Sequence, residues 1–352
     1  MNDLVLITGG AGFIGTNLAA RLLAAGRKVL IFDNLSRPGS EVNLQWLRAS
    51  FGDNLKVAVE DIRNGDAVDA AVSAASEIFH FAAQVAVTSS LKNPRVDFDI
   101  NVGGTLNVLE AMRNSRRSIP LVYTSTNKVY GALDDVELEA NDTRYQPMDR
   151  ILRETGISES RPLSFHSPYG CSKGAADQYI LDYARSFGLR AVVLRMSCIY
   201  GQRQFGNEDQ GWVAHFLIQA LARSTITVYG DGKQVRDILF VDDLVNALLL
   251  CRECMSDLSG RAFNLGGGRS NTVSLIEVLN WIRRLAAYEP AIERASPRIG
   301  DQRYFVSDTH RFSLATGWRA NVAASDGIVR LFDWLRARDQ DVEPVTAKAH
   351  MA

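Results

Sequence analysis

The fold is indicated most clearly by residues 8–15, which read Thr8-Gly9-Gly10-Ala11-Gly12-Phe13-Ile14-Gly15. This stretch follows a short apolar run at 4–8 and opens a helical pattern over 13–26. Its glycines satisfy both G-x-G-x-x-G and T-G-x-x-G-x-x-G; they permit a tight turn and let the backbone approach a pyrophosphate closely. The N-terminus of the following helix would offer free N–H groups to that anion. Because strand, turn and helix stand in the required order, the stretch predicts a dinucleotide-binding turn.

The rest of the first half alternates apolar strands with helical segments. Expected strands are 4–8, 28–33, 55–59, 78–82, 121–125, 191–195 and 263–265, and expected helices include 13–26, 97–115 and 170–187. Strand and helix in series favour a parallel sheet with helices on both faces. The sequence therefore predicts an α/β protein with a doubly wound Rossmann sheet, followed by a smaller C-terminal α/β subdomain.

The end of the second strand indicates which dinucleotide is bound. Asp33 can accept hydrogen bonds from both ribose hydroxyls and would repel a 2′-phosphate, which favours NAD over NADP. Arg37 could meet such a phosphate, but we interpret it as solvated. Asp61 and Ile62 follow the third strand, where an adenine ring would lie, although a loop cap explains Asp61 almost as well.

Tyr169 and Lys173 open the expected helix at 170–187 with i, i+4 spacing, so they lie on one helix face. An adjacent ammonium favours the phenolate and would lower the tyrosine pKa from about 10. Such a phenolate can take a proton from a sugar hydroxyl while hydride moves to NAD. Thr126, at the carboxyl end of the fifth strand, is the candidate to hydrogen-bond the reacting oxygen.

Composition excludes several classes of protein. The 352 residues carry a formal net charge of -1, which indicates neither a nucleic-acid partner nor an anionic membrane surface. We find no signal-type leader and no apolar run near the roughly 20 residues of a membrane span, so we expect a cytoplasmic protein. Cys251 and Cys254 form a C-x-x-C, but we see no partner ligands and predict no metal site.

Two polar stretches interrupt this pattern. Residues 132–167 form a long polar insertion, expected to be functional or mobile, and the tail from 337 lacks an apolar period and is expected to be disordered. The domain prediction assigns 1–190, with 191–205 and 236–266, to the NAD-binding domain. It assigns 206–235 and 267–336 to the sugar-nucleotide subdomain, and 337–352 to the tail.

These residues resemble the extended short-chain dehydrogenase/reductases of the NAD-dependent sugar-nucleotide epimerase/dehydratase family, over residues 4–320. Besides the glycine turn, the resemblance is carried by Asp33, Asp61, His80-Phe81-Ala82-Ala83, Asn101-x-x-Gly104-Thr105, Thr126, Tyr169, Lys173, Arg195, Tyr200-Gly201, Arg236-Asp237, Asn264 and Gly300-Asp301-x-Arg303. It implies an N-terminal domain that binds NAD and a smaller domain that holds the nucleotide diphosphate of a sugar. It also implies a homodimer or homotetramer that pairs helices like 97–115 and 170–187.

The resemblance also implies residue roles. Thr126, Tyr169 and Lys173 would be catalytic. NAD would contact Gly9, Gly12, Phe13, Ile14, Gly15, Asp33, Asn34, Ser36, Arg37, Asp61, Ile62, Ala82, Ala83, Asn101, Thr124, Tyr169 and Lys173. The sugar nucleotide would contact Asn127, Lys128, Arg203, Gln204, Gln210, Trp212, Arg236 and Arg303, with Arg236 and Arg303 clamping the diphosphate, as planar guanidinium groups can.

Within the family, the block Thr126-Asn127-Lys128 lacks the two carboxyl groups with which 4,6-dehydratases eliminate water. This block is similar to the subgroup that inverts C2 of CDP-linked 3,6-dideoxyhexoses. So are 166–179 and the pair of segments 201–205 and 209–213. The resemblance thus favours a CDP-sugar 2-epimerase. A UDP-hexose 4-epimerase is the alternative; a non-catalytic NAD-binding sensor or scaffold is a more distant one, against which both Tyr169 and Lys173 are present.

Overall fold

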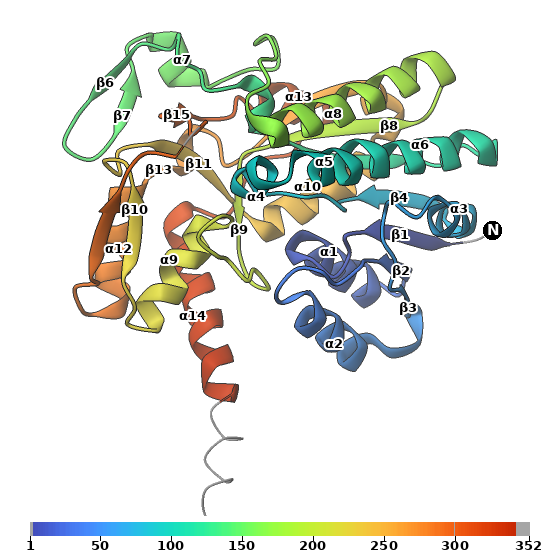
Figure 1. Ribbon diagram of the computed structural model, residues 1–352, viewed down its shortest axis with the longest axis horizontal. Helices are drawn as coiled ribbons and strands as arrows, with labels where there is room; N and C mark the ends of the chain where they lie inside the picture. Colours follow the sequence, from blue (N-terminus) through green and yellow to red (C-terminus); the bar gives the residue numbers. More distant parts are fainter. Residues whose placement is uncertain (1–2, 299, 343–352) are drawn as a thin grey trace, which may run out of the picture.

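The central element is a parallel sheet of seven strands in the order β12-β8-β5-β4-β1-β2-β3 (Figure 1). The computed structural model describes residues 3–298 and 300–342. The strands are β1 (Leu4–Thr8), β2 (Lys28–Phe32), β3 (Leu55–Ala58), β4 (Glu77–His80), β5 (Leu121–Thr126), β8 (Ala191–Met196) and β12 (Arg261–Leu265). Every neighbouring pair runs parallel, so the predicted Rossmann sheet is confirmed.

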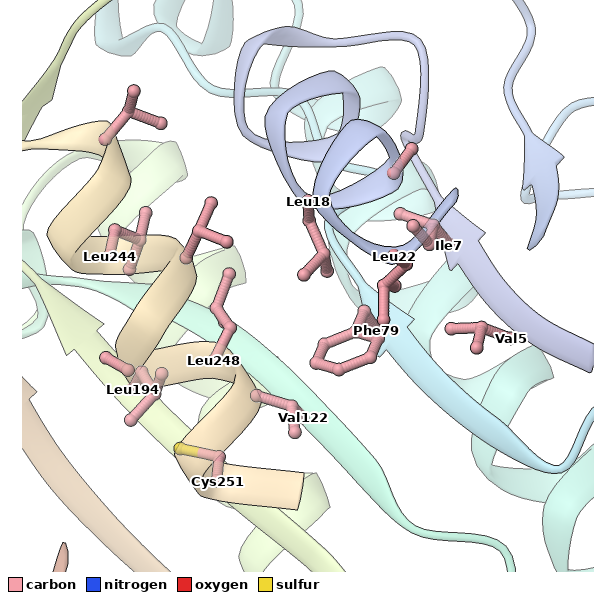
Figure 2. Packing of buried hydrophobic residues seen from close by; sticks show 14 of the residues in the cluster. Val5, Ile7, Leu18, Leu22, Phe79, Val122, Leu194, Leu244, Leu248 and Cys251 are labelled. Carbon is pink, nitrogen blue, oxygen red and sulfur yellow. The ribbon is translucent and has the colours of Figure 1, made fainter. Parts of the chain in front are cut away.

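Helices cover both faces of this sheet. One face carries α1 (Phe13–Ala24), α2 (Ser40–Phe51) and α10 (Val241–Glu253); the other carries α3 (Gly65–Ala74), α6 (Gly104–Ser115) and α8 (Ser167–Phe187). Side chains alternate along each strand, so Val5 and Ile7 pack under α1, whereas Leu6 faces the opposite layer. Figure 2 shows Leu18 of α1 and Leu248 of α10 meeting over the sheet. Burial on both faces explains why the strands read as continuous apolar runs.

The chain order places the open crevice. β1 lies between β2 and β4, so the chain leaves β1 toward one side of the sheet and later returns to build the other. Ligands of such sheets bind beyond the carboxyl ends of the strands at this switch point. The helix predicted over 97–115 is α5 (Pro94–Phe98), a π-helical turn (Asp99–Gly103) and α6; α4 (Val87–Lys92) precedes them.

The C-terminal lobe has its own sheets and core. A four-stranded sheet joins β9 (Cys198–Tyr200), β11 (Val235–Phe240), β13 (Thr272–Ser274) and β15 (Tyr304–Phe305), and β10 (Ile226–Tyr229) pairs with β14 (Ile292–Ala295). The helices α9 (Trp212–Leu221), α12 (Leu275–Ala286) and α14 (Ala324–Val342) pack against them, while α11 (Met255–Leu258) and α13 (His310–Thr316) pack near the Rossmann sheet. The predicted boundary at 236 differs from the packing, because β11 pairs within the sheet of the smaller lobe, and the chain rejoins the large sheet only with α10 and β12.

The insertion at 132–167, expected to be functional or mobile, contains regular secondary structure. It contains a hairpin of β6 (Leu138–Ala140) and β7 (Tyr145–Pro147), and a short helix α7 (Arg150–Thr155). Leu133 and Ile157 are buried against Phe305, and the Nε of Arg144 donates to Glu277 at 2.7 Å. These apolar and charged anchors hold the insertion on the C-terminal lobe (Figure 1).

The prediction that the disordered tail begins at 337 is wrong, because residue 337 lies within a helix. Helix α14 continues through 337 to Val342, because Leu335 is buried in the core of the lobe and the Arg338 guanidinium lies over the Trp334 ring. The rest of the predicted tail, 343–352, lies outside the described residues. Within the described ranges, no helix combines the length and the apolar character that a membrane span requires.

Candidate active site

A cavity of about 790 Å³ follows the carboxyl ends of β1, β2, β4 and β5 and extends into the C-terminal lobe. The glycine turn, Asp33 and Asp61 line one end, which we call the cofactor half. Lys128, Arg236 and their neighbours from the smaller lobe line the other end, the substrate half. Tyr169 and Lys173 lie on the wall of the same cavity.

The glycine turn needs its glycines for steric reasons. Gly9 has φ of 65°, and a Cβ on it would lie 2.7 Å from the backbone nitrogen of Ala82. A Cβ on Gly15 would lie 2.5 Å from the Cα of Gly10, so only glycine lets α1 pack this close to the turn. Gly12 caps α1 without a side-chain hydrogen bond, which leaves the first N–H groups of the helix free for an anion. Phe13 and Ile14 line the same end.

Asp33 stands at the end of β2, as predicted, but its carboxylate also braces the turn. It accepts hydrogen bonds from the backbone N–H of Ala11 at 3.0 Å and of Leu35 at 2.8 Å. Burial raises the pKa of Asp33, while these backbone donors and the nearby Arg37 act in the opposite direction. Arg37 is half-buried and donates to Gln210, so our expectation that it is solvated is wrong.

Asp61 is held by neighbours on two sides. Its carboxylate accepts from the Asn34 side chain at 2.9 Å and pairs with Arg63 at 2.8 Å. The hydrogen bonds from Arg63 hold the pKa of Asp61 far below its usual range. Ile62 and Ser36 line the cavity beside this group, so the predicted adenosine end is assembled in one place.

Short side chains build the middle of the cofactor half. The Thr8 hydroxyl accepts from the backbone N–H of Ala82 at 3.2 Å and shares a hydrogen bond with the buried His80 at 2.6 Å. Ala82, Ala83 and Thr124 all line the cavity. Asn101 does not, contrary to prediction: it is buried behind the wall, where it accepts from the Gln84 N–H and donates to Ser172.

The catalytic candidates come together at the centre. Tyr169 lies in the first turn of α8, and its backbone N–H donates to Ser90 at 3.1 Å. Lys173 donates to the Thr124 carbonyl at 2.7 Å and lies 4.2 Å from the centre of the Tyr123 ring. Thr126 lies near enough to Tyr169 to lower the pKa of its phenol, and both residues line the cavity. The phenol and hydroxyl can therefore meet one substrate oxygen.

The electrostatics of this pair differ from our expectation. Burial raises the pKa of Tyr169 to about 12, although the nearby Thr126 opposes this. Burial also lowers the pKa of Lys173 to about 7, against the attraction of Asp177 and Asp97. The Lys173 side chain interacts with the Thr124 carbonyl and the Tyr123 ring, so by itself it does not produce the acidic phenol that the spacing suggested.

The substrate half centres on one carboxylate between two cations. Asp301 accepts from Arg236 at 2.6 Å and pairs with Lys128 at 3.5 Å. Burial alone would raise the pKa of Asp301, but these two cations hold it below its ordinary value. Lys128 also donates to the Gly300 carbonyl at 3.0 Å, and Asn127 is fixed by Gln302 at 3.2 Å.

Arg303, the second arginine predicted to clamp the diphosphate, does not lie in the cavity. Arg303 is exposed, lies 5.0 Å from the Tyr145 ring and does not line the cavity. Arg298 lines the cavity instead, 3.9 Å from the Tyr229 ring. Arg298 and Arg303 lie on either side of Gly300-Asp301 in the chain, so the sequence motif located the segment that contributes an arginine to the cavity. Arg303 points away from the cavity because it directly precedes β15, which pairs with β11.

Three further residues predicted to contact the substrate line the cavity: Arg203, Gln204 and Gln210. The Arg203 guanidinium lies 3.6 Å from the Trp46 ring on α2 and Arg203 also lines the cavity, so its contact with the substrate stays a prediction. Gln210 accepts from Arg37 on the cofactor side, and Gln204 is buried and donates to the Ile199 carbonyl. Trp212 does line the substrate half, beside Cys198, whose thiol the prediction missed.

The residues present fit a dinucleotide. A pyrophosphate would meet the uncapped N-terminus of α1 and the glycine turn, whose space any Cβ would fill. A ribose would meet the Asp33 carboxylate at the end of β2. Among residues 3–298 and 300–342, no cluster of three or more His, Cys, Asp or Glu side chains could hold a metal ion.

Comparison with known proteins gives a consistent result. The model of a family described as the NAD dependent epimerase/dehydratase family matches residues 5–266. CDP-paratose 2-epimerase from Salmonella typhi is 44% identical, covering 94% of this chain and 98% of that protein. UDP-glucose 4-epimerase from Mycolicibacterium smegmatis is 32% identical, covering 95% and 99%.

Solved structures agree with the fold and the cofactor. The complex of Thermus thermophilus UDP-glucose 4-epimerase with NAD superimposes with a TM-score of 0.77 at 31% identity, covering 95% of this chain and 99% of that one. The predicted resemblance and the choice of NAD as cofactor are thereby confirmed. The chain belongs to the NAD dependent epimerase/dehydratase family.

Proposed function

We propose that this protein is an NAD-dependent epimerase that inverts C2 of a CDP-linked 3,6-dideoxyhexose, of the CDP-paratose to CDP-tyvelose type. The observation that carries the proposal is the 44% identity to CDP-paratose 2-epimerase over nearly the whole of both chains. The block Thr126-Asn127-Lys128 supports it, because it offers no carboxyl group for eliminating water. An epimerase needs only to take a hydride from one face of the carbon and return it to the other.

Tyr169 is the proposed base. When bound, NAD would supply a reversible hydride acceptor and a positive ring charge beside the sugar. Tyr169 takes the proton of the C2 hydroxyl, and Thr126 hydrogen-bonds the same oxygen and stabilises the 2-keto sugar. Since burial raises the Tyr169 pKa to about 12, its loss of a proton would require the added positive charge of bound NAD.

Lys173 and the wall residues position the reactants. Lys173 stands in reach of the nicotinamide ribose, held by its bond to the Thr124 carbonyl. The remaining proposed NAD contacts are Gly9, Gly12, Phe13, Ile14, Gly15, Asp33, Asn34, Ser36, Arg37, Asp61, Ile62, Ala82, Ala83 and Thr124, all of which line the cavity.

The substrate half provides the anchor for the nucleotide diphosphate. We assign that role to Arg236 and Arg298, whose guanidinium groups match phosphate oxygens. Asp301 holds Arg236 and Lys128 in place before the substrate arrives, so the diphosphate must compete with this carboxylate. Asn127, Lys128 and Trp212 would contact the sugar.

The test is incubation of the purified protein with CDP-paratose and, separately, with UDP-glucose, followed by NMR of the sugar ring. We expect inversion at C2 of the CDP-sugar and no change in the UDP-hexose. Inversion of only UDP-glucose, at C4, would overturn the substrate assignment. The similarity to UDP-glucose 4-epimerases makes this the second candidate.

We also propose a cytoplasmic homodimer or homotetramer. Helices α5 and α8 leave Phe98, Tyr179 and Phe187 exposed, at 50%, 45% and 50% of their surface, which suits a shared helical interface. Light scattering of the purified protein would give its mass; a monomer at micromolar concentration would contradict the assembly.

A further inference from the structure

Residues 202–211, which we call the strap, connect β9 to α9 along the wall of the cavity. In Figure 1 this loop leaves the C-terminal lobe and reaches toward α1 and α2. Strap residues line the same cavity as the glycine turn and Asp33. The strap therefore belongs to the smaller lobe in the chain but borders the site for the dinucleotide.

Two asparagines bind the first part of the strap to the Rossmann domain. The side chain of Asn17, in α1, donates to the Gln202 carbonyl at 3.0 Å. The side chain of Asn43, in α2, donates to the Arg203 carbonyl at 3.2 Å and to the Ala11 carbonyl at 3.3 Å. One amide thus joins the strap directly to the glycine turn.

Arg203 contacts two aromatic rings outside the strap. Its guanidinium carbon lies 3.6 Å from the centre of the Trp46 ring and 5.7 Å from that of Trp334 in α14. A cation over an indole face is attracted by the ring electrons, more strongly when water is partly excluded. Arg203 also has a positive φ of 67°, a costly backbone conformation that its contacts must maintain.

The far part of the strap closes on the loop after β2. Gln210 accepts a hydrogen bond from Arg37, and the Phe205 ring packs on Gly39. A Cβ at Gly39 would lie only 2.2 Å from the Phe205 ring, so the ring and the backbone are in direct contact. The strap is consequently fastened to α1, α2 and the loop between β2 and α2.

We propose that the strap is the closure that retains NAD(H), and that the Arg203–Trp46 contact is its main fastener. The oxidised sugar can be reduced only if the same reduced cofactor stays in place, so a release of NADH in mid-cycle would leave a stranded ketone. A closure formed by the substrate lobe on the cofactor domain prevents this release. The inference rests on the NAD site of the family and not on the identity of the sugar.

The experiment measures NADH release without any sugar. Protein loaded with NADH is mixed with excess NAD, and the decay of bound NADH fluorescence gives the release rate. We expect Arg203→Ala and Trp46→Ala each to raise the rate about tenfold, since each removes the same cation–π contact. The double variant should release NADH at about the single-variant rate, because partners in one contact are not additive.

Controls separate the strap from a general loss of structure. Trp46→Phe keeps an aromatic face and should stay near the wild-type rate. Arg261→Ala removes an exposed arginine that lies 4.7 Å from the Phe263 ring, far from the strap, and should change nothing. Gln210→Ala, at the other end of the strap, gives a smaller rise and keeps the test open should Arg203→Ala fail to fold.

Unchanged release rates in Arg203→Ala, Trp46→Ala and Gln210→Ala would overturn the proposal, as would an equal rise in Arg261→Ala. The proposed function is judged separately by NMR of the sugar product. A protein that turned out to act on another nucleotide sugar would still show the strap effect, and a true CDP-sugar epimerase could still fail it.

Discussion

In the cofactor half of the cavity, the ligand would meet backbone N–H groups and short side chains that the glycine turn holds in place. In the substrate half it meets long charged side chains, Arg236, Lys128 and Asp301, that are paired with one another. The first half is ready for its ligand, whereas the second must exchange internal ion pairs for contacts with a diphosphate. This difference suits a cavity that retains the dinucleotide in one half and exchanges the sugar nucleotide in the other.

The largest effect is expected where the two halves meet. Tyr169→Phe removes the proposed base and should lower turnover by about 10²- to 10⁴-fold, with NAD content unchanged. Tyr179→Phe, an exposed tyrosine on the same helix, is the matched control and should retain activity. Epimerisation is followed by NMR; a fully active Tyr169→Phe protein would remove the phenol from the mechanism.

The next prediction concerns the charged residues of the substrate half. Arg236→Ala should reduce kcat/KM about a hundredfold, because it removes a buried phosphate partner and leaves Asp301 with Lys128 alone. Arg303→Ala should cost several-fold at most, since Arg303 is exposed outside the cavity. Steady-state kinetics with the CDP-sugar measure both, and the reverse order would restore the assignment made from sequence.

The steric design of the cofactor half can be broken by one methyl group. Gly15→Ala places a Cβ 2.5 Å from Gly10, so the free energy of unfolding should fall by about 1–3 kcal/mol and bound NAD should be lost. Gly65→Ala, where the added carbon meets nothing within 4 Å, is the control. Urea unfolding and the absorbance of bound cofactor report the two effects; equal stabilities would show that the turn tolerates a side chain.

The last prediction concerns the pH dependence of the free energy of unfolding without cofactor. The pKa of Lys173 is about 7 in the folded chain against 10.5 when exposed, so between these values the unfolded state binds the extra proton. Stability should therefore rise with pH from about 7 toward 10, by at most about 1.4 kcal/mol per pH unit. Lys173→Met should flatten this rise, and Lys92→Met, at an exposed position, should not. Equal slopes in the two variants would show that Lys173 is not desolvated.

The difference between the halves also explains what could be predicted from sequence. The glycine turn, Asp33 and the pair Tyr169–Lys173 are local patterns, and local spacing is enough to place them. The outward direction of Arg303 and the contact of Arg203 with Trp46 could not be predicted, because they depend on β11 and α2, which lie far away in the chain. Burial is likewise a property of the whole molecule, and so the shifted pKa of Tyr169 was missed.

The ends of elements show the same limit. The helix α14 extends beyond its expected end because Leu335 finds a core that the local sequence does not display. The insertion at 132–167 folds because Ile157 packs against Phe305 across the lobe. Polar composition predicted loops in both places, and tertiary packing overrode it.

The central claim is that C2 is oxidised and reduced again by one retained cofactor. CDP-paratose carrying deuterium at C2, incubated with the enzyme in ordinary water and observed by NMR, tests it most directly. We expect the product to keep its deuterium at C2, because the hydride leaves and returns without meeting solvent. Loss of the label to water would contradict the account, since it would require the C2 proton to be removed and replaced by a base.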